Sequence, residues 1–373
     1  MSYSLATLWH ERSRFLPGVL AVAFSALLIA LQCGLLLGLF SITSIPIDHT
    51  DADIWVGNPD VLSVDLGRPI PEEWLARLAG QPEVERTEIF LQGFAYWGKP
   101  TGGTELCCLI GSRLSNDSLG AVRELTPELR RRLTEPGAVV VDEAEFERLG
   151  IKKVGDIAEV TGRRVRVVGV VRGIKSLAGP YVFASIETAR PLLRLQREPP
   201  QTMYLLARCR PGTDQAALVE RLHSYANMAT FTTADFSYRT RMHWLTKTKA
   251  GIALGCAAVL GLLVGAVVTS QTLYAATVAS LREYAVLRAL GIPRWRIAAS
   301  VVTQSFWVGI IGVAVALPAT LGLKETAEFF GSQVLLPSWL LVAAGSVTMV
   351  MALLSGLAAL RSLRLIEPAV LLR

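Results

Sequence analysis

The stretch LREYAVLRALGIPRWR, from Leu281 to Arg296, lies between two long apolar runs and decides the fold class of this 373-residue chain. Its charged side chains cannot lie at the centre of a bilayer, where each would cost about 2.5–3.5 kcal/mol. The segment must therefore lie at a membrane face. The sequence Gly291-Ile292-Pro293 predicts a short helix that ends at the glycine and a second helix that begins at the proline. A soluble motor protein can bind a short helix on a tight loop of this kind and displace it.

The composition agrees with membrane spans combined with one sizeable water-exposed domain. Hydrophobic residues make up 51% of the chain, and charged residues make up only 18%. The formal net charge of +6 comes from arginines that cluster at the ends of apolar runs, and no nucleic-acid-binding motif accompanies them. We therefore expect a membrane protein and no nucleic-acid partner.

Four apolar runs are each long enough, at 1.5 Å per residue, to cross a hydrocarbon core of about 30 Å. Arginines precede the first run, separate the second from the third and follow the fourth, so the positive-inside rule predicts cytoplasmic termini and a cytoplasmic Leu281–Arg296 loop. The predicted segments are an interfacial elbow helix at 1–14, transmembrane helix 1 at 15–42, an extracytoplasmic domain at 43–248, transmembrane helix 2 at 249–276, a cytoplasmic loop at 277–296, transmembrane helix 3 at 297–323, a short outer loop at 324–336, transmembrane helix 4 at 337–361 and a tail at 362–373.

The 43–248 region alternates between strand-like and helix-like patterns, which predicts an α+β domain large enough for its own core. Thr126 followed by Pro127 is a typical helix start. The part at about 115–198 is interpreted as an inserted β-rich lobe. The predicted fold class is thus four transmembrane α-helices, an N-terminal amphipathic helix and a large extracytoplasmic α+β domain between helices 1 and 2. Predicted strands include 54–56, 87–96, 105–110, 138–141 and 165–171, and predicted helices are 72–79, 127–133 and 214–224.

The sequence contains no motif for catalysis, metal binding or nucleotide binding. Gly-x-x-x-x-Gly-Lys-[Ser/Thr] is absent, the four histidines are scattered, and no Cys-x-x-Cys or Cys/His spacing occurs. We therefore expect a non-catalytic subunit with no catalytic residue, no metal and no cofactor of its own. For Cys107, Cys108 and Cys209 two alternatives stay open: free thiols, or a disulfide from Cys209 to one of the adjacent pair.

Glycines recur at a four-residue spacing in the second apolar run. Gly251 and Gly255 form one pair, and Gly261 and Gly265 form another, so small residues lie on one broad helix face. Small residues let two helix backbones approach closely. We interpret this face as a candidate subunit interface.

Three segments, together with the layout of the whole chain, carry a family resemblance. LREYAVLRALG (Leu281–Gly291) resembles the signature R-E-x-[AG]-[IVT]-L-[RK]-A-[LM]-G, and AALRSLRLIEPA (358–369) resembles the usual ending of the same family. Val154-Gly155-Asp156 with Arg164–Val170 resembles a segment of MacB-like outer domains. The family is the ABC transporter permeases of the FtsX/MacB class. Within it, Tyr284 and the Arg12-Ser13-Arg14 start are most similar to DevC-type exporter permeases.

The resemblance implies a permease in a bacterial inner (plasma) membrane, paired with a second copy as a homodimer or heterodimer. A separate cytoplasmic ABC ATPase would bind ATP and Mg, and a periplasmic membrane-fusion protein and an outer-membrane channel would complete the exporter. Motion of the short helix would pass along a rigid second span, continuous with the outer domain's last segment near Trp244, and drive cargo by mechanotransmission. The residues implied to contact the ATPase are Arg282, Glu283, Ala285, Arg288, Ala289, Leu290 and Gly291.

Two alternatives share this four-span layout. One is an FtsX-like signal transducer that activates a periplasmic cell-wall hydrolase, and the other is a permease that releases lipoproteins from the membrane. The three functions differ in their partners: a fusion protein with a channel, a hydrolase, or a soluble lipoprotein carrier. An outer domain of about 200 residues favours export or lipoprotein release over the cell-wall function.

Overall fold

The computed structural model describes residues 12–176, 179–196, 198–225, 227–279, 286, 290–329 and 333–364. The chain divides into two compact units, one made of Met1–Leu39 with Lys249–Arg373 and the other of Phe40–Thr248. Each unit is described by itself. Residues 1–11 of the predicted elbow helix lie outside the described residues, and residues 12–14 already belong to the first long helix.

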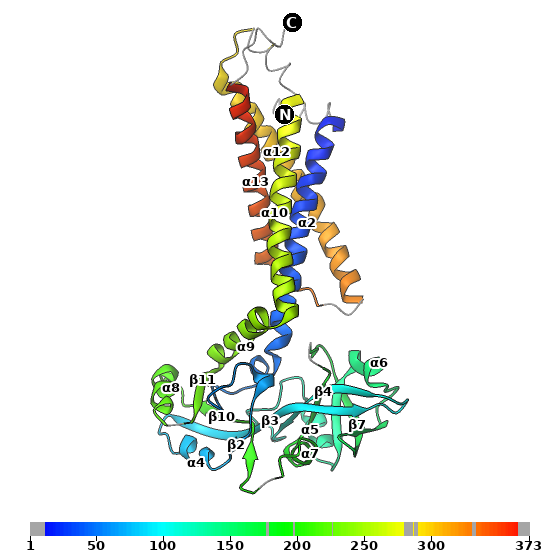
Figure 1. The fold of residues 1–373 in the computed structure, drawn as a ribbon, viewed down its shortest axis with the longest axis vertical. Helices are drawn as coiled ribbons and strands as arrows, with labels where there is room; N and C mark the ends of the chain where they lie inside the picture. The colour runs from blue at the N-terminus through cyan, green and yellow to red at the C-terminus, as the bar shows by residue number, and fades with distance from the viewer. Residues whose placement is uncertain are drawn as a thin grey trace. The chain divides into compact units, whose positions relative to one another are not determined.

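Phe40–Thr248 is an α+β domain built on a nine-stranded sheet of order β11-β1-β10-β3-β4-β8-β5-β7-β6 (Figure 1). The 15-residue strand β3 pairs with β10 through its first half and with β4 through its second half, so it joins the two ends of the sheet. The pairs β4–β8 and β5–β7 are parallel. The strands are β1 Ile54–Gly57, β2 Ile70–Pro71, β3 Val84–Gly98, β4 Thr104–Ser112, β5 Ala138–Asp142, β6 Ile157–Val160, β7 Arg163–Val171, β8 Tyr181–Ser185, β9 Gln201–Thr202, β10 Tyr204–Cys209 and β11 Ala229–Thr232.

Short helices connect the strands, and side-chain caps fix where several of them begin. The Thr126 hydroxyl accepts a hydrogen bond from the Leu129 amide, with Pro127 in the first turn as the sequence predicts. The Asp214 carboxylate accepts from the Ala216 and Ala217 amides. The helices are α3 Ile45–Asp48, η1 Val64–Leu66, α4 Trp74–Ala79, α5 Pro127–Leu133, η2 Glu143–Glu145, α6 Phe146–Leu149, α7 Ile186–Leu192, α8 Gln215–His223 and α9 Thr233–Lys247.

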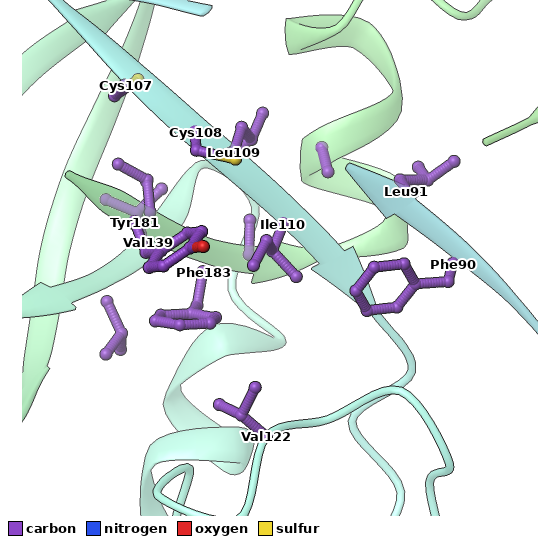
Figure 2. Packing of buried hydrophobic residues seen from close by; sticks show 14 of the residues in the cluster. Phe90, Leu91, Cys107, Cys108, Leu109, Ile110, Val122, Val139, Tyr181 and Phe183 are labelled. Atoms are coloured by element: carbon purple, nitrogen blue, oxygen red, sulfur yellow. The ribbon is translucent and has the colours of Figure 1, made fainter. Parts of the chain in front are cut away.

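Alternate residues of the central strands enter two separate apolar cores. Ile54 and Val56 of β1 join a cluster with α4 and α8, whereas Trp55 joins the larger cluster on the other face. The Trp55 ring centroid lies 5.2 Å from that of Phe90 and 5.7 Å from that of Tyr204. Further along the sheet, register pairs Cys108 with Tyr181 and Ile110 with Phe183, and these side chains pack together (Figure 2).

The cysteines are free thiols. Cys107 and Cys108 lie in β4 and Cys209 ends β10, and β3 separates these two strands. Two strand spacings amount to about 9.6 Å, which is beyond the reach of a disulfide. The alternative of a bridge from Cys209 to the adjacent pair is therefore wrong.

The other unit contains four helices long and apolar enough to span a membrane, at Phe15–Thr43, Lys249–Ala276, Trp295–Phe329 and Ser338–Leu357. The predicted fold class, four apolar spans with an α+β domain after the first, is confirmed. The third helix continues through residues 324–329, where a loop was expected. Those six residues include no glycine or proline, and Lys324 pairs with Glu328 one turn later at 3.6 Å. The full helices are α2 Arg12–Thr43, α10 Lys249–Ala279, α12 Arg294–Phe329 and α13 Ser338–Arg364 (Figure 1).

Candidate functional site: the helix seam and the junction of α3 and α9

The loop predicted to contact an ATPase falls mostly outside the described residues. Arg282, Glu283, Ala285, Arg288 and Ala289 lie there, so their role stays a prediction. The described end of the loop has the expected form. The Leu290 amide donates to the Val286 carbonyl at 3.0 Å, Gly291 has a left-handed φ of +86°, and α12 begins at Arg294. Leu290 itself is 75% exposed, so its side chain is free to contact a partner.

The glycine face of α10 packs against α2 of the same chain. A Cβ on Gly261 would lie 2.6 Å from Leu28 Cδ2, and a Cβ on Gly265 would lie 3.2 Å from Ser25 Cβ. The Ser25 hydroxyl donates to the Gly265 carbonyl at 3.0 Å and lies 2.9 Å from the Thr269 hydroxyl. Gly261 and Gly265 thus allow close packing of α2 and α10. Their predicted place at a subunit interface stays a prediction, as it does for the buried Gly251 and the half-buried Gly255.

Small residues also line the contacts of α2 with the other two helices. Ala23 and Ala26 of α2 cluster with Ala316 of α12, and Ala30 clusters with Ala344 of α13. In the most apolar stretch of α2, 44% of the residues are buried, compared with 17% for α10. Helix α2 therefore contacts each of the other three spanning helices. We call this set of small-residue contacts around α2 the helix seam.

Helix α10 keeps a broad apolar face that no described helix covers. Leucines and valines on this face are 40–60% exposed, which suits contact with lipid or with another helix. They are Val259, Leu260, Leu262, Leu263, Val264 and Val267.

The segments that follow α2 and precede α10 are bound to each other inside the α+β domain. Arg241 of α9 forms an ion pair with Asp48 of α3 at 2.5 Å, and its Nε donates to the Ser44 hydroxyl at 2.8 Å. The Ser44 hydroxyl donates in turn to Asp48 at 2.6 Å. We call α3, α9 and this network the junction, because both chain connections to the spanning helices pass through it.

A second contact ties α9 to the sheet through a buried carboxyl group. Asp65 of η1 accepts hydrogen bonds from Trp244 Nε1 at 3.1 Å and from Gln92 Nε2 at 2.9 Å. Burial raises the pKa of the Asp65 carboxyl to about 6, although these hydrogen bonds oppose the rise. The Gln92 side chain also reaches Cys108, and its Oε1 atom has no hydrogen-bond partner among the described residues. The junction thus contacts the domain core through one titratable group.

The helix is interrupted between the junction and the second span. Helix α9 ends at Lys247, α10 begins at Lys249, and Thr248 between them has extended backbone angles of φ −95° and ψ 145°. The expectation of one rigid helix from Trp244 through the span is therefore wrong. Thr248 leaves the helical conformation, so the backbone bends at this residue. The Thr248 hydroxyl bridges this bend by donating to the Trp244 carbonyl at 2.5 Å.

Sequence reasoning did not find the junction. It placed Trp244 at a membrane interface, where tryptophans are common, but the ring donates to a carboxylate of the domain. The relevant signal was the high polarity of 233–248, with Arg239 and Arg241 only two residues apart just before an apolar run. Nothing in the sequence identifies Asp48 as the partner of Arg241, or Asp65 as the partner of Trp244.

Four apolar helices around a small-residue seam, with a large α+β domain inserted after the first, define a four-span membrane protein. A family model described as the MacB-like periplasmic core domain matches residues 19–225, more than half of the chain. A second, described as the FtsX-like permease C-terminal, matches residues 255–368. The chain belongs to the family of ABC transporter permeases that combine these two parts. This confirms the resemblance to the FtsX/MacB class, and the finer likeness to DevC-type permeases stays a prediction.

Two relatives are themselves described as ABC transporter permeases. An uncharacterized ABC transporter permease of Mycobacterium tuberculosis is 22% identical over 326 residues, covering 87% of this chain and 85% of the relative. Another, from Mycobacterium bovis, is 25% identical over 220 residues, covering 58% of each chain. The crystal structure of the periplasmic region of MacB from Actinobacillus actinomycetemcomitans has a TM-score of 0.34 and 12% identity, covering 52% of this chain and 94% of that one.

Proposed function

We propose that this chain is the permease subunit of an ATP-driven exporter that works by mechanotransmission. In this proposal it lies in a bacterial inner membrane with both termini cytoplasmic and the α+β domain outside. A separate ABC ATPase binds ATP and Mg and contacts the loop from Arg282 to Gly291. The exposed face of α10 pairs with a second permease copy. The α+β domain drives cargo toward a membrane-fusion protein and an outer-membrane channel.

The observation that carries the proposal is the Arg241–Asp48–Ser44 network of the junction. Without it, no ion pair among the described residues would join α3 to α9, and a displacement of one span could be absorbed by its own connection. With it, the segments after span one and before span two move together as one lever on the sheet. Helix α9 also reaches the core through Phe236, whose ring centroid lies 5.6 Å from that of Trp55.

The environment of the Arg241–Asp48 ion pair supports its proposed role in holding α3 and α9 together. The side chains of Arg241 and Asp48 are 39% and 29% exposed, so the pair is partly shielded from solvent and also hydrogen-bonded through Ser44. Such a network holds orientation better than an isolated surface pair, which contributes only about 0–1 kcal/mol. Its main effect is then on geometry rather than on overall stability.

The test measures ATP hydrolysis and export separately, with the chain and its ATPase reconstituted in liposomes or expressed in the native membrane. Arg241→Met should leave ATPase binding and hydrolysis within about twofold of wild type and reduce export at least tenfold. Arg172→Met is the matched control, because it removes another arginine–carboxylate pair at the domain surface. The double exchange Asp48→Arg with Arg241→Asp should restore part of the export. Normal export by a folded Arg241→Met protein would overturn the lever.

The contact with the ATPase is tested by charge reversal in the cytoplasmic loop. Glu283→Lys with Arg288→Glu should abolish co-purification of the ATPase while leaving the chain in the membrane. Intact assembly and export in this variant would contradict the proposed contact. Activation of a cell-wall hydrolase without any transported cargo would instead favour the signal-transducing alternative.

A further inference from the structure

An open cavity of about 790 Å³ lies at one edge of the domain's sheet. None of its lining residues belongs to the junction, so the cavity is a separate feature of the domain. Cavities of about 300–1,000 Å³ are typical of sites for small organic ligands. The cavity is therefore large enough to hold a small organic ligand.

The sheet topology brings four strand ends to this cavity. Strands β4 and β8 are parallel, with Ser112 opposite Ser185, so both strands end at the same edge of the sheet. Strand β5 runs antiparallel to β8 and parallel to β7, so β5 and β7 begin at that edge. Arg113 after β4 and the Arg163-Arg164 pair that starts β7 consequently line one cavity. Three strand spacings, about 14 Å, separate β4 from β7.

The cavity is positively charged, and its arginines have no carboxylate partner. Arg113, Arg163 and Arg164 line it together with a single acidic residue, Glu187, which leaves two net positive charges. All three arginines are exposed, and within the described part of the chain their guanidinium groups form no ion pair or hydrogen bond. Nearby arginines differ in this respect, because Arg166 pairs with Glu135, Arg190 with Glu72 and Arg132 with Glu128.

The floor of the same cavity is apolar. Val165, Ile186 and Leu192 line it and are at most 8% exposed, so they form a firm surface continuous with the domain core. The wall near α7 is held in place because the Gly137 amide donates to the Thr188 hydroxyl at 3.3 Å. A rim of free guanidinium groups around an apolar floor suits a ligand with an anionic head and an apolar body.

We infer that this cavity binds an anionic amphiphile. Arg113, Arg163 and Arg164 hold its phosphate, sulfate or carboxylate head, and the apolar body covers Val165, Ile186 and Leu192. The inference goes beyond the proposed transport role, because binding requires neither ATP nor a partner subunit. A small ligand is favoured over a protein segment because the cavity combines a compact volume of about 790 Å³ with an apolar floor.

The experiment uses the full chain in phosphatidylcholine nanodiscs and octyl phosphate as the probe, titrated calorimetrically below its micelle concentration. One saturable site per chain is expected. Arg113→Gln and the double variant Arg163→Gln/Arg164→Gln should each weaken binding at least tenfold. Arg172→Gln and Arg86→Gln, which remove exposed and paired arginines elsewhere in the domain, should leave it unchanged. Substitutions of exposed arginines seldom unfold a domain, so these variants should stay folded.

Ligand comparisons make the result decisive. Inorganic phosphate should bind at least tenfold more weakly than octyl phosphate, and neutral octyl glucoside should not compete. Equal affinity for inorganic phosphate, competition by octyl glucoside or no effect of the arginine variants would overturn the inference. Failure to bind octyl phosphate, with loss of a protein partner in the arginine variants, would assign the surface to an acidic protein segment and also overturn it.

The source of the headgroup is distinguished by nanodisc composition. If bilayer lipid supplies it, phosphatidic acid in the nanodisc should weaken the apparent affinity for octyl phosphate. If the natural ligand is a free amphiphile, the affinity should stay the same. Both results support the site, and neither depends on the outcome of the export assays.

Discussion

The α+β domain and the helix seam are both apolar inside, but they are built from side chains of opposite size. The largest fully buried side chains among the described residues all belong to the domain, and the rings of Tyr204, Phe90 and Phe236 pack around that of Trp55. The seam instead contains alanine, glycine and serine, such as Ala26 and Gly265. The difference reflects the solvent in which each region folds.

In water, burying a large aromatic side chain contributes several kcal/mol, so a domain gains most from bulky core residues. Between spanning helices, the lipid is as apolar as the protein interior, and that gain disappears. Close backbone approach and short hydrogen bonds then stabilise the contact, and small residues provide both. Exposed leucines on α10 would favour aggregation in water but are ordinary in a membrane.

The largest expected difference is between truncating a buried aromatic side chain of the domain and truncating an exposed apolar side chain of α10. Trp55→Ala should lower the free energy of unfolding of the domain by about 3–5 kcal/mol, because it leaves a cavity among three other rings. Leu263→Ala, on the exposed face of α10, should change it by less than about 0.5 kcal/mol. Denaturant unfolding of the full chain in neutral detergent measures both. Equal effects would contradict the distinction.

The next prediction concerns the charge buried in the domain. The folded-state pKa of Asp65 is raised to about 6, so the folded domain holds the proton more tightly than the unfolded chain does. Its contribution to stability is therefore fully present below about pH 4 and is lost as the pH rises through about 6. At about 1.4 kcal/mol per pKa unit, the loss amounts to at most about 3 kcal/mol.

Replacing this carboxyl group isolates its effect. Between pH 4.5 and pH 8, wild-type stability should fall more than that of Asp65→Asn, and the variant should be the more stable protein at pH 8. Denaturant midpoints at the two pH values give the difference. Identical pH profiles would show that Asp65 is not the titrating group.

Two glycines of α12 sharpen the comparison inside the bundle. A Cβ on Gly312 would lie 2.5 Å from Val22 Cγ1 and 2.7 Å from Val22 Cβ, whereas a Cβ on Gly322 would meet no heavy atom within 4 Å. Gly312→Ala should therefore destabilise the bundle by about 1–3 kcal/mol through overpacking. Gly322→Ala should be neutral or slightly stabilising, because alanine favours a helix. Thermal unfolding in detergent compares them, and equal destabilisation would argue against tight packing at Val22.

The smallest expected effect is the loss of the Ser25 hydroxyl. Ser25→Ala removes its two contacts with α10, to the Gly265 carbonyl and the Thr269 hydroxyl, together with its bond to the Ala21 carbonyl within α2. Hydrogen bonds between spanning helices contribute on average about 0.6 kcal/mol, so the loss should be of that order. Thr303→Ala is the control, because among the described residues the Thr303 hydroxyl bonds within its own helix, to the Ala299 carbonyl. A loss above about 2 kcal/mol would mean that the hydroxyl organises more of the seam than these two contacts.

The sequence alone gave the features that depend on local composition. Hydropathy over about twenty residues predicts a span wherever it occurs, and Gly291 marks the turn before α12 because a residue without a Cβ adopts a left-handed φ readily. The strands around Trp55 and Phe90 were also predictable, since alternation and β-branching are local patterns. The family signature from Leu281 to Gly291 is likewise a contiguous stretch.

The tertiary structure alone decided which distant residues meet. Arg241 and Asp48 are 193 positions apart, and Trp244 and Asp65 are 179 apart, so no local pattern could pair them. The break at Thr248 and the gathering of Arg113 with Arg163 and Arg164 likewise depend on the path of the chain and on the strand order. Hydropathy and propensity act over a few residues, whereas ion pairs and cavities form only after strands and helices have packed.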